Sequence, residues 1–376
     1  MTTLKNLTIY TEKGILEHAY IQFDKKIINI GTGDIEGIDM DGKIMIPGFI
    51  DQHIHGSHGA DVMDATPRAL EMIALSLPQE GVTSFLATTM TDTKENIIKA
   101  LENVNDHITQ NEKPTAECLG IHLEGPFISP IYKGAQRADA IQMPDIELFK
   151  TFLDASGHHI KQVTLAPEIP NALPLIDFLK TKSIVTSIGH SNATYEDVKT
   201  AIEHGSNCFT HAYSAMSKFH HRDIGIVGGM FLHDESYAEL ICDLIHTSAE
   251  AAKILYRQKT DDKIILITDA MRAKGLSDGT YSLGGQKVIK SLNAARLEDG
   301  TLAGSALKYD QGVRNFKDVT QADLTSLIKV ASENPAKLHN LFHRKGSIAI
   351  GKDADLLIIS PNIDIIETYC KGVRCY

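Results

Sequence analysis

The stretch PGFIDQHIHGSHG, residues 47–59, holds three histidines within six positions. His53 and His55 are separated by one residue and belong to an apolar run that favours a β-strand. Because alternate side chains of a strand point to the same face, both imidazoles can reach one ion. This pair alone is weak evidence for a metal, since a metal site needs further ligands from elsewhere in the chain.

The middle of the chain alternates between strand patterns and helix patterns. SIVTSIGH (183–190) is typical of a buried strand, and ATYEDVKTAIEHG (193–205) is typical of a helix that stops at a glycine. Seven or eight such units favour a parallel α/β barrel, and the first strand lacks the glycine-rich loop of an open dinucleotide-binding sheet. We therefore predict a TIM (β/α)8 barrel over residues 47–344.

Both ends of the chain carry short strand patterns separated by turn residues. NLTIYT (6–11) and HAYIQFD (18–24) lie in the first segment, and similar apolar runs between Gly and Asp turns fill the last segment. We predict that residues 1–46 and 345–376 together form one small β-sandwich domain. The alternative is that the two ends are unrelated additions to the barrel.

The composition excludes several classes of protein. The formal net charge of −11 argues against a nucleic-acid or anionic-membrane partner. The five cysteines are scattered and odd in number, which is typical of free thiols in a reducing compartment. The N-terminus does not resemble a signal peptide, and no apolar run of about 18 residues occurs. A cytoplasmic location is therefore expected.

Most of the predicted barrel strands end in side chains that can bind a metal or a proton. These residues are His53, His55, His122, Glu124, His190, His211, Asp243, His246 and Asp269. The C-terminal strand ends of a TIM barrel form its active-site face, so these side chains are expected to converge. Imidazoles and carboxylates together suit zinc, iron or manganese, and a thiolate cage is not available. We predict one or two divalent metal ions.

Each of these histidines has a purely structural alternative, because a single histidine at a strand end more often makes hydrogen bonds within the core. Five or six such residues at the same end of successive strands are not expected by chance, so together they favour a metal site. Four histidines stand beside better-placed candidates and keep the structural interpretation: His58, His122, His220 and His221. The others are predicted to lie at the surface: His18, His107, His158, His159, His204, His233, His339 and His343.

The order of the motifs resembles one enzyme family. GFIDQHIHG, HLEGPF, GHSNATY, THAYSAM, ITDA, LAGS and GSIAIGKDADLLI follow one another as in the N-acetylglucosamine-6-phosphate deacetylases of the amidohydrolase superfamily, from about Pro47 to the C-terminus. HLEGPF and GHSNATY are specific to this deacetylase group. The resemblance implies a barrel with a small β-sandwich, usually a homodimer, and metal-dependent hydrolysis of N-acetylglucosamine 6-phosphate to glucosamine 6-phosphate and acetate.

The resemblance also implies roles for individual residues. Glu124, His190 and His211 match the principal metal ligands, and because His53 and His55 are intact a second ion bridged by Glu124 is possible. Asp269 matches the catalytic acid and base, and His246 a donor to the oxyanion. Arg222 matches an arginine that binds the substrate phosphate. The implied substrate contacts are Ala135, Gln136, Ser214, Ala215, Arg222, His246, Leu302, Ala303 and Gly304.

Three positions depart from the family pattern. Ser214 replaces an asparagine, Gln136 replaces a histidine, and Leu244 stands where glycine is common. The first two changes affect expected substrate contacts, so they could lower the affinity for a phosphorylated sugar or indicate a related substrate. They leave the expected metal ligands unchanged.

Other functions remain as alternatives. A cyclic amidase that bridges two metals through a carboxylated lysine is disfavoured, because no lysine stands at a comparable strand end. A deaminase, or a deacetylase of a related N-acyl amino sugar, shares the same metal chemistry. A catalytically silent scaffold of the same shape tends to lose ligands, whereas this chain keeps all of those expected. The expected partner is a small phosphorylated amino sugar, with no nucleic acid and no membrane.

Overall fold

The protein is described by a computed structural model that covers residues 1–111 and 113–376. Eight strands form one sheet in the order β15-β14-β13-β12-β11-β10-β9-β6, and all neighbouring pairs are parallel. These strands are β6 (Phe49–Ile54), β9 (Val82–Thr89), β10 (Glu117–Glu124), β11 (Ile160–Leu165), β12 (Val185–Ile188), β13 (Cys208–Phe209), β14 (Tyr237–Ile241) and β15 (Ile264–Ile267).

The sheet closes where its first and last strands meet. The Asp269 N–H donates to the His53 carbonyl at 2.8 Å, and the His55 N–H donates to the Ala270 carbonyl at 2.9 Å. Ile54 and Ala270 form a parallel bridge at the same place. The predicted TIM barrel is therefore confirmed.

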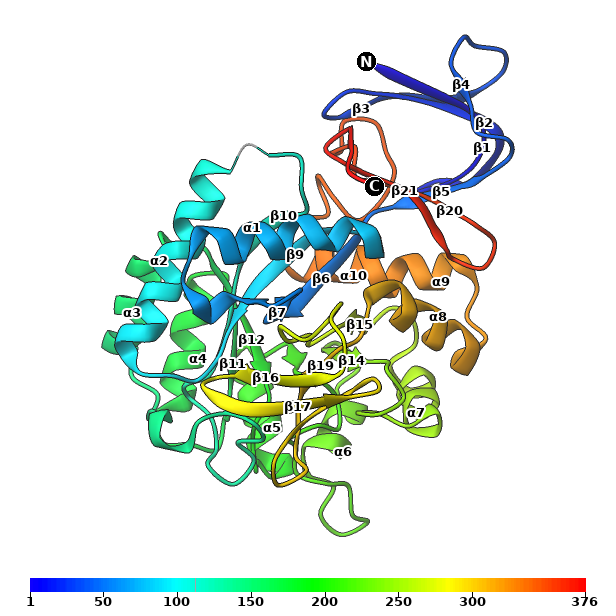
Figure 1. The fold of residues 1–376 in the computed structure, drawn as a ribbon. Coiled ribbons are helices and arrows are strands. Elements are labelled where there is room, and N and C mark those ends of the chain that lie inside the picture. Colours follow the sequence, from blue (N-terminus) through cyan, green and yellow to red (C-terminus); the bar gives the residue numbers. More distant parts are fainter. Residues whose placement is uncertain (112) are drawn as a thin grey trace.

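Helices surround the barrel (Figure 1). They are α1 (Pro67–Ser76), α2 (Lys94–Gln110), α3 (Ile146–Ala155), α4 (Ala172–Thr181), α5 (Tyr195–His204), α6 (Gly225–Leu232), α7 (Ala249–Lys259), α8 (Tyr309–Thr320), α9 (Leu324–Ile328) and α10 (Asn334–Leu338), with the short helices η1 (Val62–Asp64), η2 (Leu77–Glu80), η3 (Ala138–Ala140) and η4 (Lys329–Glu333). Side-chain caps explain where several helices begin: the Thr194 and Ser248 hydroxyls accept hydrogen bonds from the first turns of α5 and α7.

A four-stranded antiparallel sheet is inserted between β15 and α8, and the sequence patterns did not predict it. Its strands are β16 (Gly279–Leu283), β17 (Gln286–Ser291), β18 (Ala294–Leu297) and β19 (Leu302–Ser305), drawn in yellow in Figure 1. The two-stranded sheet of β7 (Gly56–Ser57) and β8 (Ala60–Asp61) follows the first barrel strand. A parallel bridge between Ala270 and Ser305 brings the end of β19 to the end of β15.

The two ends of the chain share a second eight-stranded sheet. Its order is β22-β21-β20-β5-β1-β2-β3, with β4 paired to β1. Its strands are β1 (Thr2–Thr11), β2 (Gly14–Phe23), β3 (Ile27–Thr32), β4 (Ile38–Asp39), β5 (Ile44–Pro47), β20 (Leu356–Ile359), β21 (Ile365–Cys370) and β22 (Val373–Arg374). This sheet encloses its own apolar core, which includes Ile21, Phe23 and Leu356. The expected small β domain built from both termini is thus present.

In the part of the chain that the structure describes, no helix is both long and apolar enough to span a bilayer. All five cysteines are free, and four of them are buried. The cytoplasmic location stays a prediction.

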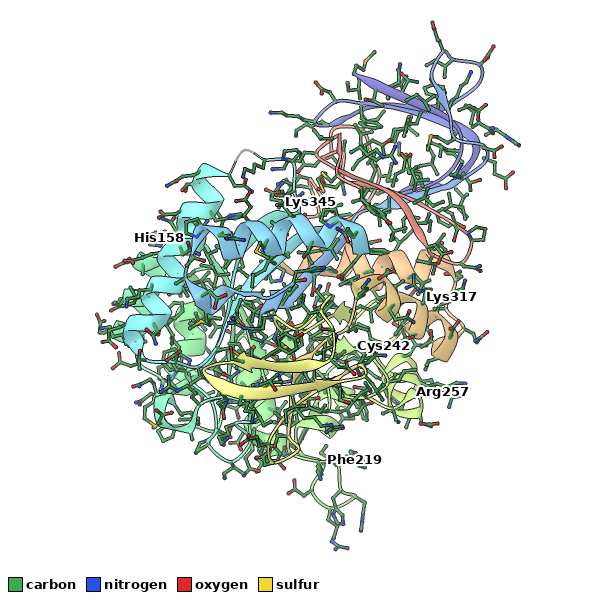
Figure 2. The ribbon with its side chains drawn as sticks, in the orientation of Figure 1. His158, Phe219, Cys242, Arg257, Lys317 and Lys345 are labelled. Atoms are coloured by element: carbon green, nitrogen blue, oxygen red, sulfur yellow. The ribbon has the colours of Figure 1, made fainter. Side chains whose placement is uncertain are left out.

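A buried lysine joins the barrel to the terminal sheet. Lys345 lies between them in Figure 2, with its ammonium 2.8 Å from Glu117 at the start of β10 and paired with Asp355 just before β20. Burial alone would lower the pKa of Lys345, but Asp355 and Glu117 outweigh burial and raise it. The two sheets therefore depend on a charged lysine that water does not reach.

We predict that Lys345→Met lowers the free energy of unfolding by about 3–5 kcal/mol, because it leaves buried carboxylates without their partner. Lys371 pairs with the same Glu117 at 3.1 Å but is 46% exposed, so it is the matched control. Lys371→Met should cost about 0–1 kcal/mol. Denaturant titration of both variants measures the difference, and equal losses would contradict the role of Lys345.

Candidate active site and metal centre

A cavity of about 350 Å³ lies at the C-terminal ends of the barrel strands. Six of its lining residues are histidines or carboxylates, which can bind a metal or a proton: His55, Glu124, His190, His211, His246 and Asp269. Among the residues that the structure describes, no lysine or arginine lines this cavity. The parallel strands thus bring together side chains that are far apart in the sequence, as the barrel topology requires.

Glu124, at the end of β10, is the centre of this group. Its Oε1 lies 3.2 Å from Nε2 of His190 and 3.2 Å from Nε2 of His211. The two Nε2 atoms are 3.1 Å apart. Potential ligand atoms of these three residues all lie within 4.8 Å of one another, which is close enough to share one ion.

His53 and His55 approach Glu124 from the first barrel strand. Nε2 of His53 lies 3.4 Å from Glu124 Oε1, and Nε2 of His55 lies 3.2 Å from Glu124 Oε2. The Asp269 carboxylate lies 3.5 Å and 3.2 Å from the same two nitrogens. His53, His55 and Asp269 form a second group of potential ligands, so Glu124 stands between two candidate ion positions.

The imidazoles are oriented by contacts at their other ring nitrogen. Nδ1 of His190 lies 3.0 Å from the Tyr132 carbonyl, and Nδ1 of His55 lies 3.2 Å from the Thr88 carbonyl. A carbonyl can only accept, so each Nδ1 carries a proton, and Nε2 is the nitrogen that can bind an ion. Nε2 of His53 is buried and has no hydrogen-bond partner within the described residues. An unpartnered buried nitrogen beside two carboxylates fits a cation.

The electrostatics of the group favour a positive charge at its centre. Burial alone would raise the pKa of Glu124, but His53 and the two hydrogen-bonded imidazoles outweigh burial and hold it well below its usual value. Burial lowers the pKa of His55, but Asp269 and Glu124 outweigh burial and raise it to about 9. The carboxylates thus attract protons to the imidazoles, and a divalent ion would compete for the same lone pairs.

The backbone is strained at several of these positions. His190, His211, Asp269 and Ala215 have φ values of 48°, 32°, 48° and 49°, in a region that residues other than glycine rarely adopt. Such outliers often cluster at functional sites, where the surrounding structure holds them. Gly125, directly after Glu124, has φ of 79°, and a Cβ there would lie 2.1 Å from the Thr91 hydroxyl.

Most of the expected substrate residues line the cavity: Ala135, Gln136, Ser214, Ala215, His246, Leu302 and Gly304. The Gln136 amide donates to Oε2 of Glu124 at 2.8 Å and accepts from the Thr91 N–H at 2.7 Å, so in this structure it holds Glu124. Ala303 is buried beside Met271, and Arg222 is exposed on the loop after β13. Neither Ala303 nor Arg222 reaches this cavity.

Among the histidines outside the group, His220, His221 and His339 differ from the expectations. His122 is buried against the Thr164 hydroxyl at 2.7 Å, and burial lowers its pKa to about 3. His220 and His221 are exposed, and His58 lines a different cavity. The prediction of a surface position was wrong for His339, which is buried with Nε2 3.2 Å from the Gln52 side-chain oxygen.

Sequence reasoning missed Glu239, a fully buried residue of β14 that contacts His53. One signal was available: a carboxylate inside the apolar run YAELI needs a partner in the core. The partners come from other strands, so the sequence does not name them.

The sequence profile of the amidohydrolase family matches residues 44–375. The chain belongs to the amidohydrolase family. It is 44% identical over 380 residues to N-acetylglucosamine-6-phosphate deacetylase of Bacillus subtilis (strain 168), covering 98% of this chain and 96% of that protein. It is 33% identical over 370 residues to N-acetylgalactosamine-6-phosphate deacetylase of Escherichia coli O157:H7, covering 98% of both.

The fold is also similar to that of a mutant N-acetyl-D-glucosamine-6-phosphate deacetylase from Mycobacterium smegmatis in complex with N-acetyl-D-glucosamine-6-phosphate. The TM-score is 0.94 at 25% identity, covering 100% of this chain and 99% of that one. The family and the clustered imidazoles and carboxylates together support a divalent metal in this amidohydrolase.

We predict that metal removal destabilises the protein. Chelation should lower the thermal midpoint, and adding Zn²⁺, Mn²⁺ or Fe²⁺ at about 100 times its dissociation constant should restore about 2.7 kcal/mol. Glu124→Gln is the control, because it removes the carboxylate that both candidate positions share. Calorimetry with metal analysis measures the effect. A wild-type midpoint that does not respond to any of these ions would contradict the metal centre.

Proposed function

We propose that this amidohydrolase removes the acetyl group of N-acetylglucosamine 6-phosphate and yields glucosamine 6-phosphate and acetate. One observation carries the proposal: Glu124, His190 and His211 converge in an open cavity within reach of Asp269. The relatives support the substrate, since this chain covers nearly the whole length of a deacetylase of that sugar phosphate.

Glu124, His190 and His211 would hold one divalent ion, and His53 and His55 would hold a second beside Glu124. Zinc, iron and manganese all fit this set of donors. When bound, such an ion lowers the pKa of water from about 16 towards about 7 and polarises the acetyl carbonyl. The protein supplies the proton transfers and the orientation of the amide.

In this proposal Asp269 moves the proton. Burial alone would raise its pKa, but His53 and His55 outweigh burial and keep it low, so the group is a carboxylate at neutral pH. A carboxylate takes the proton of the attacking water, and the resulting acid returns it to the amine nitrogen, which leaves poorly unless protonated. His246 also lines the cavity, and its Nδ1 is held 2.7 Å from Asp243. In this role Nε2–H of His246 would donate to the oxyanion.

The phosphate needs a cation that the cavity of one chain does not supply, as far as the structure describes it. Arg222 lies on an exposed loop together with Phe219, which is 55% exposed and projects from the body of the molecule in Figure 2. We propose a homodimer in which this loop carries Arg222 to the cavity of the other copy. A guanidinium pairs with a phosphate through two parallel hydrogen bonds.

A second candidate substrate is N-acetylgalactosamine 6-phosphate. Gln136 and Ser214 replace the histidine and asparagine of the family pattern, and Gln136 is engaged with Glu124. A relative that is 33% identical to this chain is a deacetylase of N-acetylgalactosamine 6-phosphate, which supports this candidate. Release of acetate from both sugar phosphates, and from their unphosphorylated forms, decides between the candidates.

We predict that Asp269→Asn lowers kcat by about 10²–10⁴, because an amide cannot accept the proton. The variant should keep the ion held by Glu124, His190 and His211, since none of these contacts is removed. Acetate release and metal content are measured on the same sample. Full activity in this variant would remove Asp269 from the proposed role.

We predict that Arg222→Ala raises KM for the phosphorylated sugar by about 10-fold or more, the loss of one charge-assisted contact of about 1.5–3 kcal/mol. KM for the unphosphorylated sugar should hardly change. Lys218→Ala is the matched control, because Lys218 is an exposed cation of the same loop. Equal effects on both sugars, or equal effects of both substitutions, would contradict the phosphate contact.

A further inference from the structure

We infer that Glu239 is a positioning residue that holds one ligand of each candidate ion, His53 and His211, from inside the barrel. The inference rests on the proposed function, specifically on the two ion positions on either side of Glu124. Glu239 lies on β14 below the cavity and is fully buried. It does not line the cavity, so it touches neither substrate nor reacting atoms.

Both oxygens of Glu239 are engaged. Oε2 lies 3.0 Å from Nδ1 of His53 and accepts from the main-chain N–H of His211 at 3.3 Å. Oε1 accepts from the side-chain amides of Gln52 at 2.8 Å and Gln162 at 2.7 Å. Four donors from three strands, β6, β11 and the end of β13, therefore fix the carboxylate, which in turn fixes its partners.

The contact between Glu239 and Nδ1 of His53 determines which nitrogen of His53 can bind an ion. A carboxylate at Nδ1 requires a proton there, so Nε2, which lies 3.4 Å from Glu124 Oε1, is the nitrogen available to an ion. Such a carboxylate also makes the ring a stronger metal ligand. His55 and His190 have neutral carbonyls at Nδ1 instead, and Nδ1 of His211 has no partner among the described residues. His53 therefore depends on a charged partner in a way that these other imidazoles do not.

A third ion position is the competing interpretation, because potential ligand atoms of His53, His122 and Glu239 also lie within 4.8 Å of one another. The hydrogen bonds argue against it. Glu239 already accepts from four donors, and the space between its carboxylate and His53 is bridged by the Nδ1 proton. Glu239 therefore orients ligands and does not bind an ion itself.

Glu239→Gln keeps the size of the side chain and removes its charge. The NH2 of the new amide is a donor, and it must face one of two pairs of groups: His53 and the His211 N–H, or the amides of Gln52 and Gln162. All four of these groups donate to Glu239 in this structure, so one pair loses its acceptor. We expect metal affinity at the position that uses His53 to fall about 10–100-fold. The position that uses Glu124, His190 and His211 should be affected less, because all three side chains remain.

The test compares wild type, Glu239→Gln and Gln162→Met. Gln162→Met is the matched control, since Gln162 is an equally buried partner of Glu239 that contacts no proposed ligand. Metal-free proteins are equilibrated with buffered free Zn²⁺ over a range of concentrations. Bound zinc per chain is then measured by elemental analysis, with the thermal midpoint of each metal-free protein as a separate record of stability.

Gln162→Met should bind two ions with the same affinities as wild type, even if its thermal midpoint is lower. Glu239→Gln should bind the first ion normally and require about 10–100 times more free Zn²⁺ for the second. If Glu239→Gln does not fold, Glu239→Asp, which keeps the charge on a shorter side chain, should show a smaller shift in the same direction.

Zinc binding by Glu239→Gln that equals wild type overturns the inference about Glu239 alone. Wild type that holds a single ion at saturating Zn²⁺ removes the position that uses His53, and the inference falls with it. Wild type that holds no ion contradicts the proposed function itself.

Discussion

A buried carboxylate, Glu124, needs positive charge around it, and the site is built to supply that charge. Four imidazole Nε2 atoms lie within 3.4 Å of its two oxygens. Taking a carboxylate out of water is costly unless it is paired or binds a metal. The strained backbone at His190, His211 and Asp269 indicates that the fold holds these side chains in place at a cost in conformational energy.

Closure of the barrel sets the position of the proton-transfer group. Hydrogen bonds between the ends of β6 and β15 join the main chain of Asp269 to that of His53. The same junction places the Asp269 carboxylate beside His53 and His55. The inserted sheet then brings Leu302 and Gly304 to the cavity through the bridge at Ser305. Fold and site therefore share one set of contacts, so a change at this junction affects stability and catalysis together.

The sequence predicts the candidate metal ligands better than the buried residues that hold those ligands in place. His53 and His55 could be found because strand alternation and the position at a strand end are local features. Glu239 and His339 could not be placed, because burial of a polar side chain depends on partners such as Gln52 that come from a distant strand. The inserted sheet was missed because its short strands interrupt the alternation of strands and helices. Arg222 was found by resemblance, and in one chain its guanidinium lies 2.9 Å from Nε2 of His221.

The most direct test of the account is anomalous X-ray diffraction from crystals grown with a transition metal such as zinc. We predict an anomalous peak about 2.0–2.2 Å from an oxygen of Glu124 and from Nε2 of His190 and of His211, the distances of zinc to such ligands. A crystal in which these three side chains contact no ion at saturating metal would contradict the account.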